Sequence, residues 1–209
     1  PAFYEGCKEH LAEVQAILDS PGAATFENTI VALEKSGQYL GRMLRVFYNK
    51  SSSDTNDTLD AIEEEIAPKF AAHQDAISLN PVLFKRIKDL YDSRESLGLN
   101  TEDAWLLERY YKDLIHEGAH LTEAQRERLK ELNEELSTLE TLFSKNVLAD
   151  TNDLAVLVDS VEQLDGLSEN QIAAAAAAAK DRGHDGKWLI GMVNFTGNPV
   201  LDSLTNREL

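Results

Sequence analysis

The chain has 209 residues, of which 43% are hydrophobic and 27% charged, and its formal net charge is −17 at pH 7. This is the composition of a soluble globular protein, and so acidic a surface repels phosphate backbones and anionic lipids, which argues against nucleic-acid and membrane binding. The single cysteine, Cys7, excludes a disulfide framework within the chain and favours a reducing, cytoplasmic setting.

The first fifty residues predict two amphipathic helices. The first covers Phe3–Leu18 and stops at Ser20-Pro21-Gly22. Thr25 is the expected N-cap of the second, in which apolar residues recur every three or four positions and Gly37 fills a gap in the stripe. We predict one long helix with one buried face, formed by Phe26, Ile30, Leu33, Leu40, Leu44 and Phe47.

Four further helices are expected before residue 150. The third runs from about 54–57 to Leu79, with a kink at Pro68, and Asn80-Pro81 begins the fourth. Asn100 or Thr101 caps the fifth. Thr122 and Gln125 form a capping box that opens the sixth, whose apolar face consists of Leu129, Leu132, Leu136, Leu139 and Phe143.

The pattern changes after Asp150. Residues 154–160 (LAVLVDS) and 187–193 (KWLIGMV) have the short, apolar and β-branched character of strands. Between them a capping box at 168–171 leads into the alanine-rich helix 173–179. We therefore predict a mainly α fold, an antiparallel multi-helix array with a small two-stranded β element near the C-terminal end, organised as a helical body (1–150) and a smaller α/β appendage (151–209).

Both ends of the chain suggest a piece of a longer protein. The sequence begins at Pro1 without a methionine, and Thr205 has the character of the first residue of a further helix. We therefore expect the chain to be a segment of a larger enzyme or scaffold.

Residues 116–120 read His-Glu-Gly-Ala-His, which matches the zinc-protease motif H-E-x-x-H. When such a motif is helical, its two histidines share a face and can bind one Zn²⁺, while the glutamate acts as general base toward the metal-bound water. Glu140 lies downstream, where a third ligand would be sought. The pattern raises the hypothesis of a small zinc protease using His116, Glu117 and His120.

The residues around the motif argue against a shared helix. Gly118 is a natural end for the fifth helix, and the capping box at Thr122 begins a new one. His120 would then lie in the connection between two helices, where it could not share a helical face with His116.

The remaining geometry argues the same way. His116 lies on a mixed, largely solvated helix face with Trp105, Arg109 and Lys112, and a histidine in the last turn interacts favourably with the helix dipole. Glu140 would lie about 27 Å along the sixth helix at roughly 1.5 Å per residue, whereas a zinc-ligand oxygen lies within about 2.2 Å of the metal.

A second set of acidic residues has the spacing of a calcium-binding loop. Its sixth position is Leu59 rather than the glycine that the sharp turn of such a loop needs. A capped helix with an acidic first turn explains these residues better; they are Asp54, Asn56, Thr58, Asp60 and Glu65.

Three further histidines belong to no motif. His73 is a lone helical histidine, more often a structural hydrogen-bonding residue than a ligand, and His10 and His184 have no partner in the sequence. No nucleophile motif and no glycine-rich phosphate loop occurs. We therefore predict no catalytic, cofactor-binding or metal-binding residue in this chain.

Four blocks of the sequence carry a family resemblance. They are TFENTIVALEKSG (25–37), EIAPKFAAHQDAISLNPVLFKRI (65–87), LNEELSTLETLFSKNVLADTN (132–152) and DGKWLIGMVN (185–194). Taken together and in order, they resemble the N-terminal region of bacterial peptidyl-dipeptidases, which belong to the thimet oligopeptidase-like zinc metallopeptidase family together with oligopeptidase A.

The resemblance implies a two-lobed, mostly helical enzyme with a deep channel. In that family the zinc motif, His-Glu-Phe-Gly-His, and a further glutamate ligand lie beyond the region that this chain resembles. The N-terminal region builds a wall of the channel and restricts access to short, unfolded peptides, from whose C-terminus peptidyl-dipeptidases release dipeptides. No residue of this chain matches a catalytic position of the family.

Our expectation is therefore an inactive channel-wall segment, with zinc in the intact enzyme but none in this chain. Its partners would be short peptide substrates and the missing catalytic portion of the same protein. Two alternatives stay open: the small zinc protease described above, and a non-enzymatic helical scaffold that binds partner helices.

Overall fold

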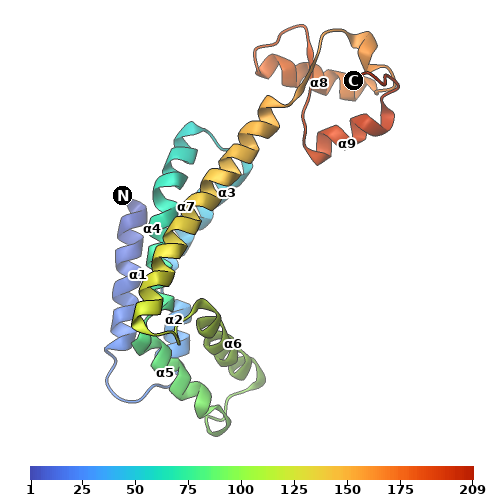
Figure 1. The fold of residues 1–209 in the computed structure, drawn as a ribbon. Coiled ribbons are helices and arrows are strands. Elements are labelled where there is room, and N and C mark those ends of the chain that lie inside the picture. Colours follow the sequence, from blue (N-terminus) through green and yellow to red (C-terminus); the bar gives the residue numbers. More distant parts are fainter. The chain divides into compact units, whose positions relative to one another are not determined.

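A computed structural model describes the backbone of residues 1–209 and the side chains of residues 1–193 and 197–209. The chain forms two compact units, Pro1–Leu142 and Phe143–Leu209. Helices dominate, and a two-stranded antiparallel sheet lies near the C-terminal end of the sequence, which confirms the predicted fold class (Figure 1). None of the described helices has both the length and the apolar character needed to span a membrane.

The first unit begins with α1 (Ala2–Leu18), which packs against α3 (Gln38–Ser53) and α4 (Asp57–Ser78). The predicted end of the first helix is confirmed, and Pro68 lies within α4. Apolar side chains from all three helices meet in one buried cluster, which consists of Phe3, Leu40, Leu44 and Ile66.

Two further helices pack against each other, α5 (Pro81–Asp92) and α6 (Thr101–Glu117), with the short helix η2 (Arg94–Ser96) between them in sequence. Asn80 caps α5 by accepting hydrogen bonds from two backbone N–H groups of its first turn, and Asn100 caps α6 in the same way through one. Both caps confirm the sequence prediction, because asparagine oxygens satisfy the free donors of a helix start.

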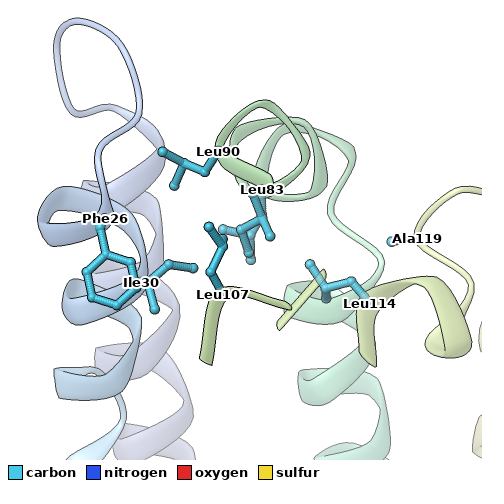
Figure 2. Close-up of a cluster of buried hydrophobic side chains, with 8 residues drawn as sticks. Phe26, Ile30, Leu83, Leu90, Leu107, Leu114 and Ala119 are labelled. Atoms are coloured by element: carbon cyan, nitrogen blue, oxygen red, sulfur yellow. The ribbon is translucent and has the colours of Figure 1, made fainter. Parts of the chain in front are cut away.

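A second buried cluster joins α5 and α6 to the π-helix η1 (Phe26–Val31). Ile30, Ile87 and Leu107 are 0% exposed at its centre. Figure 2 shows Phe26 and Ile30 of η1 facing Leu107 of α6, with Leu83 and Leu90 of α5 closing the other side. Because full burial of one such side chain contributes about 1.5–3 kcal/mol, this cluster is a main source of stability in the first unit.

The predicted continuous helix from Phe26 to Phe47 is wrong. The Thr25 capping box is present, but η1 passes into α2 (Ala32–Lys35), whose C-cap is Ser36, and α3 begins only after Gly37. Gly37 has a φ of +66°, a left-handed conformation that glycine adopts freely and other residues resist. The glycine therefore ends a helix rather than filling a gap in an apolar stripe.

Contacts from α1 hold this helix break. The Glu13 carboxylate accepts a hydrogen bond of 2.6 Å from the Gly37 backbone N–H. A Cβ atom at Gly37 would lie 2.8 Å from Cε1 of His10, so the imidazole sits directly against the glycine. The Ser36 hydroxyl closes the end of α2 by donating to the Leu33 carbonyl at 2.7 Å.

The long helix α7 (Glu123–Asp153) begins where predicted. Thr122 donates its backbone N–H to Gln125 Oε1 at 3.0 Å. No residue of α7 is classed as buried within the described side chains, and Leu132, Leu136 and Leu139 are 44%, 53% and 55% exposed. The apolar face predicted for this helix is therefore largely uncovered in this structure, although Leu129 is half-buried and Leu136 lines a small pocket with Phe70 of α4.

In the second unit, β1 (Val156–Val158) pairs antiparallel with β2 (Trp188–Ile190). The helix α8 (Glu169–Asp181) starts at the predicted Ser168 capping box and packs against β2. Two smaller elements complete the unit, η3 (Val161–Leu164) and α9 (Asn194–Ser203). Its core contains Val158, Leu164 and Ile190.

The prediction that Thr205 begins a helix is wrong. The preceding helix α9, which was not predicted, ends at Ser203, and the residues from 204 onward are not helical. Thr205 donates its backbone N–H to the Asp165 carbonyl at 2.9 Å and its hydroxyl to the Asp165 carboxylate at 2.7 Å. Its side chain therefore fixes a loop segment instead of capping a helix.

We expect Gly37→Ala to destabilise the first unit by at least about 1–2 kcal/mol, because that is the cost of a left-handed residue with a Cβ. Gly41→Ala is the matched control, since a Cβ at Gly41 meets only Arg45, at 3.9 Å, and replacing a helical glycine stabilises by about 0.5–1 kcal/mol. Urea unfolding followed by circular dichroism measures both, and shifts of the same sign would contradict the role given to Gly37.

Candidate functional site: a cleft in the first unit

A cleft of about 620 Å³ opens in the first unit between α2, α3, α4 and α6. Its volume lies within the range of about 300–1,000 Å³ that is usual for small-ligand pockets. Apolar side chains of α3, α5 and α6 form its floor. They include Leu40, Leu44, Leu83, Ile87 and Leu114.

One face of α6 forms a rim of this cleft. Trp105, Arg109, Asp113 and Glu117 follow one another at intervals of four residues, so they lie on the same side of the helix. The Arg109 guanidinium lies 5.9 Å from the centre of the Trp105 ring and 3.0 Å from an Asp113 carboxylate oxygen. The prediction that Trp105 and Arg109 lie on a largely solvated side of the helix is confirmed, since both are exposed, and the structure places them at the cleft mouth.

The rim carries an excess of negative charge. Glu34 from α2 joins Asp113 and Glu117, so three carboxylates are set against the single guanidinium of Arg109. The C-terminal end of α6 adds to this, because the unpaired carbonyls of a helix end carry about half a negative charge. The cleft therefore favours a positively charged ligand.

A hydrogen bond links the two sides of the cleft. The Tyr110 hydroxyl donates to Glu34 Oε1 at 2.7 Å. Burial raises the pKa of Tyr110 far above its ordinary value, and the bond to Glu34 raises it further. Tyr110 is therefore held as a neutral phenol that ties α6 to α2.

Among the residues that line the cleft, a series of hydrogen bonds runs from Ser36 through His10 to His73. His10 Nε2 lies 3.2 Å from Ser36 Oγ, and His10 Nδ1 lies 3.0 Å from His73 Nε2. The only proton of the Ser36 hydroxyl goes to the Leu33 carbonyl, so Ser36 must accept from His10 Nε2. It follows that His10 Nδ1 accepts from His73 Nε2, since a neutral imidazole has one donor and one acceptor.

This order of donors leaves the other His73 nitrogen without a proton. His73 is 6% exposed, and its Nδ1 has no hydrogen-bond partner among the described residues. Burial lowers the pKa of both histidines; the neighbouring His10 lowers that of His73 further, and Glu13 partly opposes the shift of His10. The pair is therefore neutral near pH 7 and contains one buried acceptor without a donor.

The interpretation of His10 as a residue without a partner is wrong, whereas His73 is the structural hydrogen-bonding residue that was expected. The two lie 63 positions apart in sequence. No local spacing connects them, so only the packing of α1 on α4 brings them together.

The His-Glu-Gly-Ala-His motif spans a helix end. α6 stops at Glu117, and Gly118 has a φ of +98° and donates its N–H to the Ile115 carbonyl. Both histidines are exposed, His116 in the last helical turn and His120 beyond the glycine, while the third candidate ligand, Glu140, is exposed on α7. The spacing needed for a shared helical face is lost, so these residues do not fit a zinc centre.

No other metal centre emerges from the described side chains: no group of three or more histidine, cysteine, aspartate or glutamate residues among them is arranged to hold an ion. Of the residues at calcium-loop positions, Asn56, Thr58 and Asp60 belong to the capped start of α4. Asp54 pairs with Lys50, and Glu65 pairs with Lys69. Asn56 accepts from the N–H groups of Thr58 and Leu59, and Asp60 accepts from the Thr55 hydroxyl. The capped-helix interpretation of this segment is confirmed.

Comparison with known proteins identifies relatives of this chain. The chain is 39% identical over 207 residues to dipeptidyl carboxypeptidase of Escherichia coli, a match that covers 99% of this chain. It is 36% identical over 208 residues to the dipeptidyl carboxypeptidase of Salmonella typhimurium, and 25% identical over 209 residues to oligopeptidase A of Escherichia coli. The predicted resemblance is confirmed. These homologues are peptidases by name.

The match covers only part of each relative. The chain spans 30% and 31% of the two dipeptidyl carboxypeptidases and 31% of oligopeptidase A, whereas 99–100% of its own residues are covered. No protein-family model matches the chain.

We expect the first unit to lose stability as the pH falls below about 6.5. The histidine pKa values are lower in the folded state than the value of about 6.5 in an unfolded chain, so unfolding takes up protons in acid and stability is complete only above that pH. Thermal unfolding from pH 8 to pH 5 measures the slope. A His73→Phe variant should flatten it, whereas His184→Gln, at an exposed site in the second unit, should not; equal slopes in all three proteins would refute the assignment.

Proposed function

We propose that this chain is the N-terminal, channel-wall region of a zinc metallopeptidase of the peptidyl-dipeptidase and oligopeptidase type, which hydrolyses short peptides. One observation carries the proposal: 39% identity along 99% of the chain to a dipeptidyl carboxypeptidase of which it spans 30%. Its single cysteine supports a cytoplasmic setting as part of the same proposal.

In this proposal the catalytic zinc belongs to another part of the longer protein, where it supplies an activated water for attack on the peptide carbonyl. The helix end at Gly118 supports that division, because it separates His116 from His120. The residues described here would shape the approach to the channel, and the chain alone would not cleave peptides.

The uncovered face of α7 supports the presence of a further partner surface. Leu132, Leu136 and Leu139 lie at intervals of four and three residues, so they form one apolar stripe on the helix. Contiguous exposed apolar surface marks an interaction site more often than it marks ordinary solvent-facing surface. In the proposed enzyme, the catalytic portion of the same protein covers this stripe.

The first experiment separates the intact enzyme from its N-terminal region. We expect the longer protein to bind stoichiometric zinc and to hydrolyse short peptides, and the 209-residue chain to do neither. Metal analysis by mass spectrometry and a chromogenic peptide assay measure both properties. A His116→Ala and His120→Ala double variant of the longer protein should keep its zinc; loss of zinc in that variant would restore the small-protease hypothesis.

The second experiment tests the α7 surface. We expect Leu139→Glu to change the stability of the isolated chain by no more than about 0.5 kcal/mol, as for other exposed sites, because Leu139 is 55% exposed. In the longer protein the same change should cost several kcal/mol, since an unpaired charge would then be buried.

The matched control is Leu107→Ala, which should cost about 2–5 kcal/mol in both proteins because Leu107 is already fully buried within the first unit itself. Urea unfolding measures the four variants against their two parent proteins. Equally small effects of Leu139→Glu in both proteins would mean that the catalytic portion does not cover α7.

A further inference from the structure

The cleft mouth contains a carboxylate without a partner. Glu117 forms no ion pair or side-chain hydrogen bond with the described residues, whereas Asp113 pairs with Arg109 and Glu34 accepts from Tyr110. Glu117 and Asp113 lie one turn apart, so their Cβ atoms are about 5–6 Å from each other. A cation placed between them would also interact favourably with the negative end of the α6 dipole.

The inside of the cleft has the opposite character. The cleft lining as a whole exposes far more apolar than polar surface, and the leucine and isoleucine side chains of its floor carry no charge. A ligand with an apolar group and one positive charge matches both the apolar lining and the acidic rim.

We propose that this cleft binds a peptide segment in which an apolar side chain stands next to a positive charge. The apolar side chain rests on the floor formed by α3, α5 and α6, and the cation lies between Asp113 and Glu117. The inference rests on the proposed function only in taking peptides as the ligand class. It adds a site outside the catalytic centre and a charge preference for what binds there.

The charge balance of the chain favours this ligand over an anionic one. The net charge is −17, and the rim adds a local excess of carboxylates, so an acidic peptide meets repulsion both at a distance and at the site. The rim groups are solvent-exposed, so the attraction weakens as salt rises, with a screening length of about 10 Å at 0.1 M.

Trp105 provides the readout. It is 61% exposed at the rim, and the chain has two tryptophans, of which Trp188 belongs to the second unit. In a Trp188→Phe background, the emission of Trp105 should shift to shorter wavelength when a peptide covers it. The probes are N-acetylated, C-amidated pentapeptides, Ala-Leu-Leu-Lys-Ala and its counterpart with glutamate in place of lysine.

We expect the lysine peptide to bind on the order of tenfold more tightly than the glutamate peptide at low salt, and the difference to shrink at 0.5 M salt. The peptide Ala-Leu-Leu-Gln-Ala with a free N-terminus tests whether a terminal ammonium can replace the lysine side chain. Equal affinities of the lysine and glutamate peptides would overturn the proposal, as would the absence of any emission shift up to millimolar concentration.

Variants locate the site. An Asp113→Asn and Glu117→Gln double variant should abolish the preference for lysine, whereas Glu95→Gln with Glu102→Gln, which removes the same charge from exposed positions outside the cleft, should preserve it. Gly41→Leu tests the floor. Gly41 lines the cleft on α3, so a larger side chain there should fill the cleft and lower the affinity for every peptide.

Circular dichroism verifies that each variant is folded before binding is compared. Binding that survives both the double variant and Gly41→Leu would place the peptide elsewhere and refute the inference. Self-association of the chain that Gly41→Leu abolishes would instead make the cleft a contact between two copies and would also refute it. Neither result bears on the peptidase assay of the longer protein, so the proposed function is tested separately.

Discussion

The helix break at Gly37 is the constraint on which the first unit depends. A positive φ, a carboxylate from α1 and an imidazole lying against the missing Cβ all act at this one residue. Because the chain turns here, α2 and α3 contribute to the same cleft from separate helices instead of continuing as one rod. Glu34 before the break and Leu40 after it thereby become a rim residue and a floor residue of one site.

The same break connects the cleft to the buried histidines. Ser36 closes α2 and accepts from His10, which in turn accepts from His73 of α4. A helix end, an interhelical contact and a ring orientation are therefore fixed by one chain of hydrogen bonds. Such a network is sensitive at each link, because a lost partner leaves a buried polar group unsatisfied.

Sequence reasoning succeeded where the signal is local. Caps at Thr25, Asn80, Asn100, Thr122 and Ser168 depend on one side chain and the next three residues, and each lies where it was expected. The end of α6 at Gly118 was also predicted from local sequence. That prediction correctly placed His116 inside the helix and His120 beyond it.

Sequence reasoning failed where distant contacts decide. Gly37 interrupts a regular helical pattern of apolar residues. No residue nearby in sequence indicates that His10 and Glu13 of α1 hold it in a left-handed conformation. The cleft could not be predicted for the same reason, since its residues come from six helices, α1 to α6. α9 escaped notice because Gly197 and Pro199 weaken the helical pattern of its segment.

The exposed face of α7 was only half predictable. The stripe of leucines follows from residue spacing alone, but spacing does not say what covers a face. The chain matches relatives about three times as long. A longer protein has further surface that could cover the leucines of α7, which gives a physical reason for their exposure in this chain.

The hydrogen bond between Tyr110 and Glu34 gives the stability of the cleft an upper pH limit, in addition to the lower limit that the histidines set. Tyr110 has a raised pKa in the folded state, so its contribution is complete below the ordinary phenol pKa of about 10 and is lost as the pH rises through the folded value. The histidine pair fails in the opposite direction, by gaining protons in acid. The hydrogen bonds of the cleft walls thus depend on neutral Tyr110 and on the neutral pair of His10 and His73. The phenol becomes negatively charged in alkali and the histidines become positively charged in acid, so the cleft keeps this structure only in the pH range between the two ionisations.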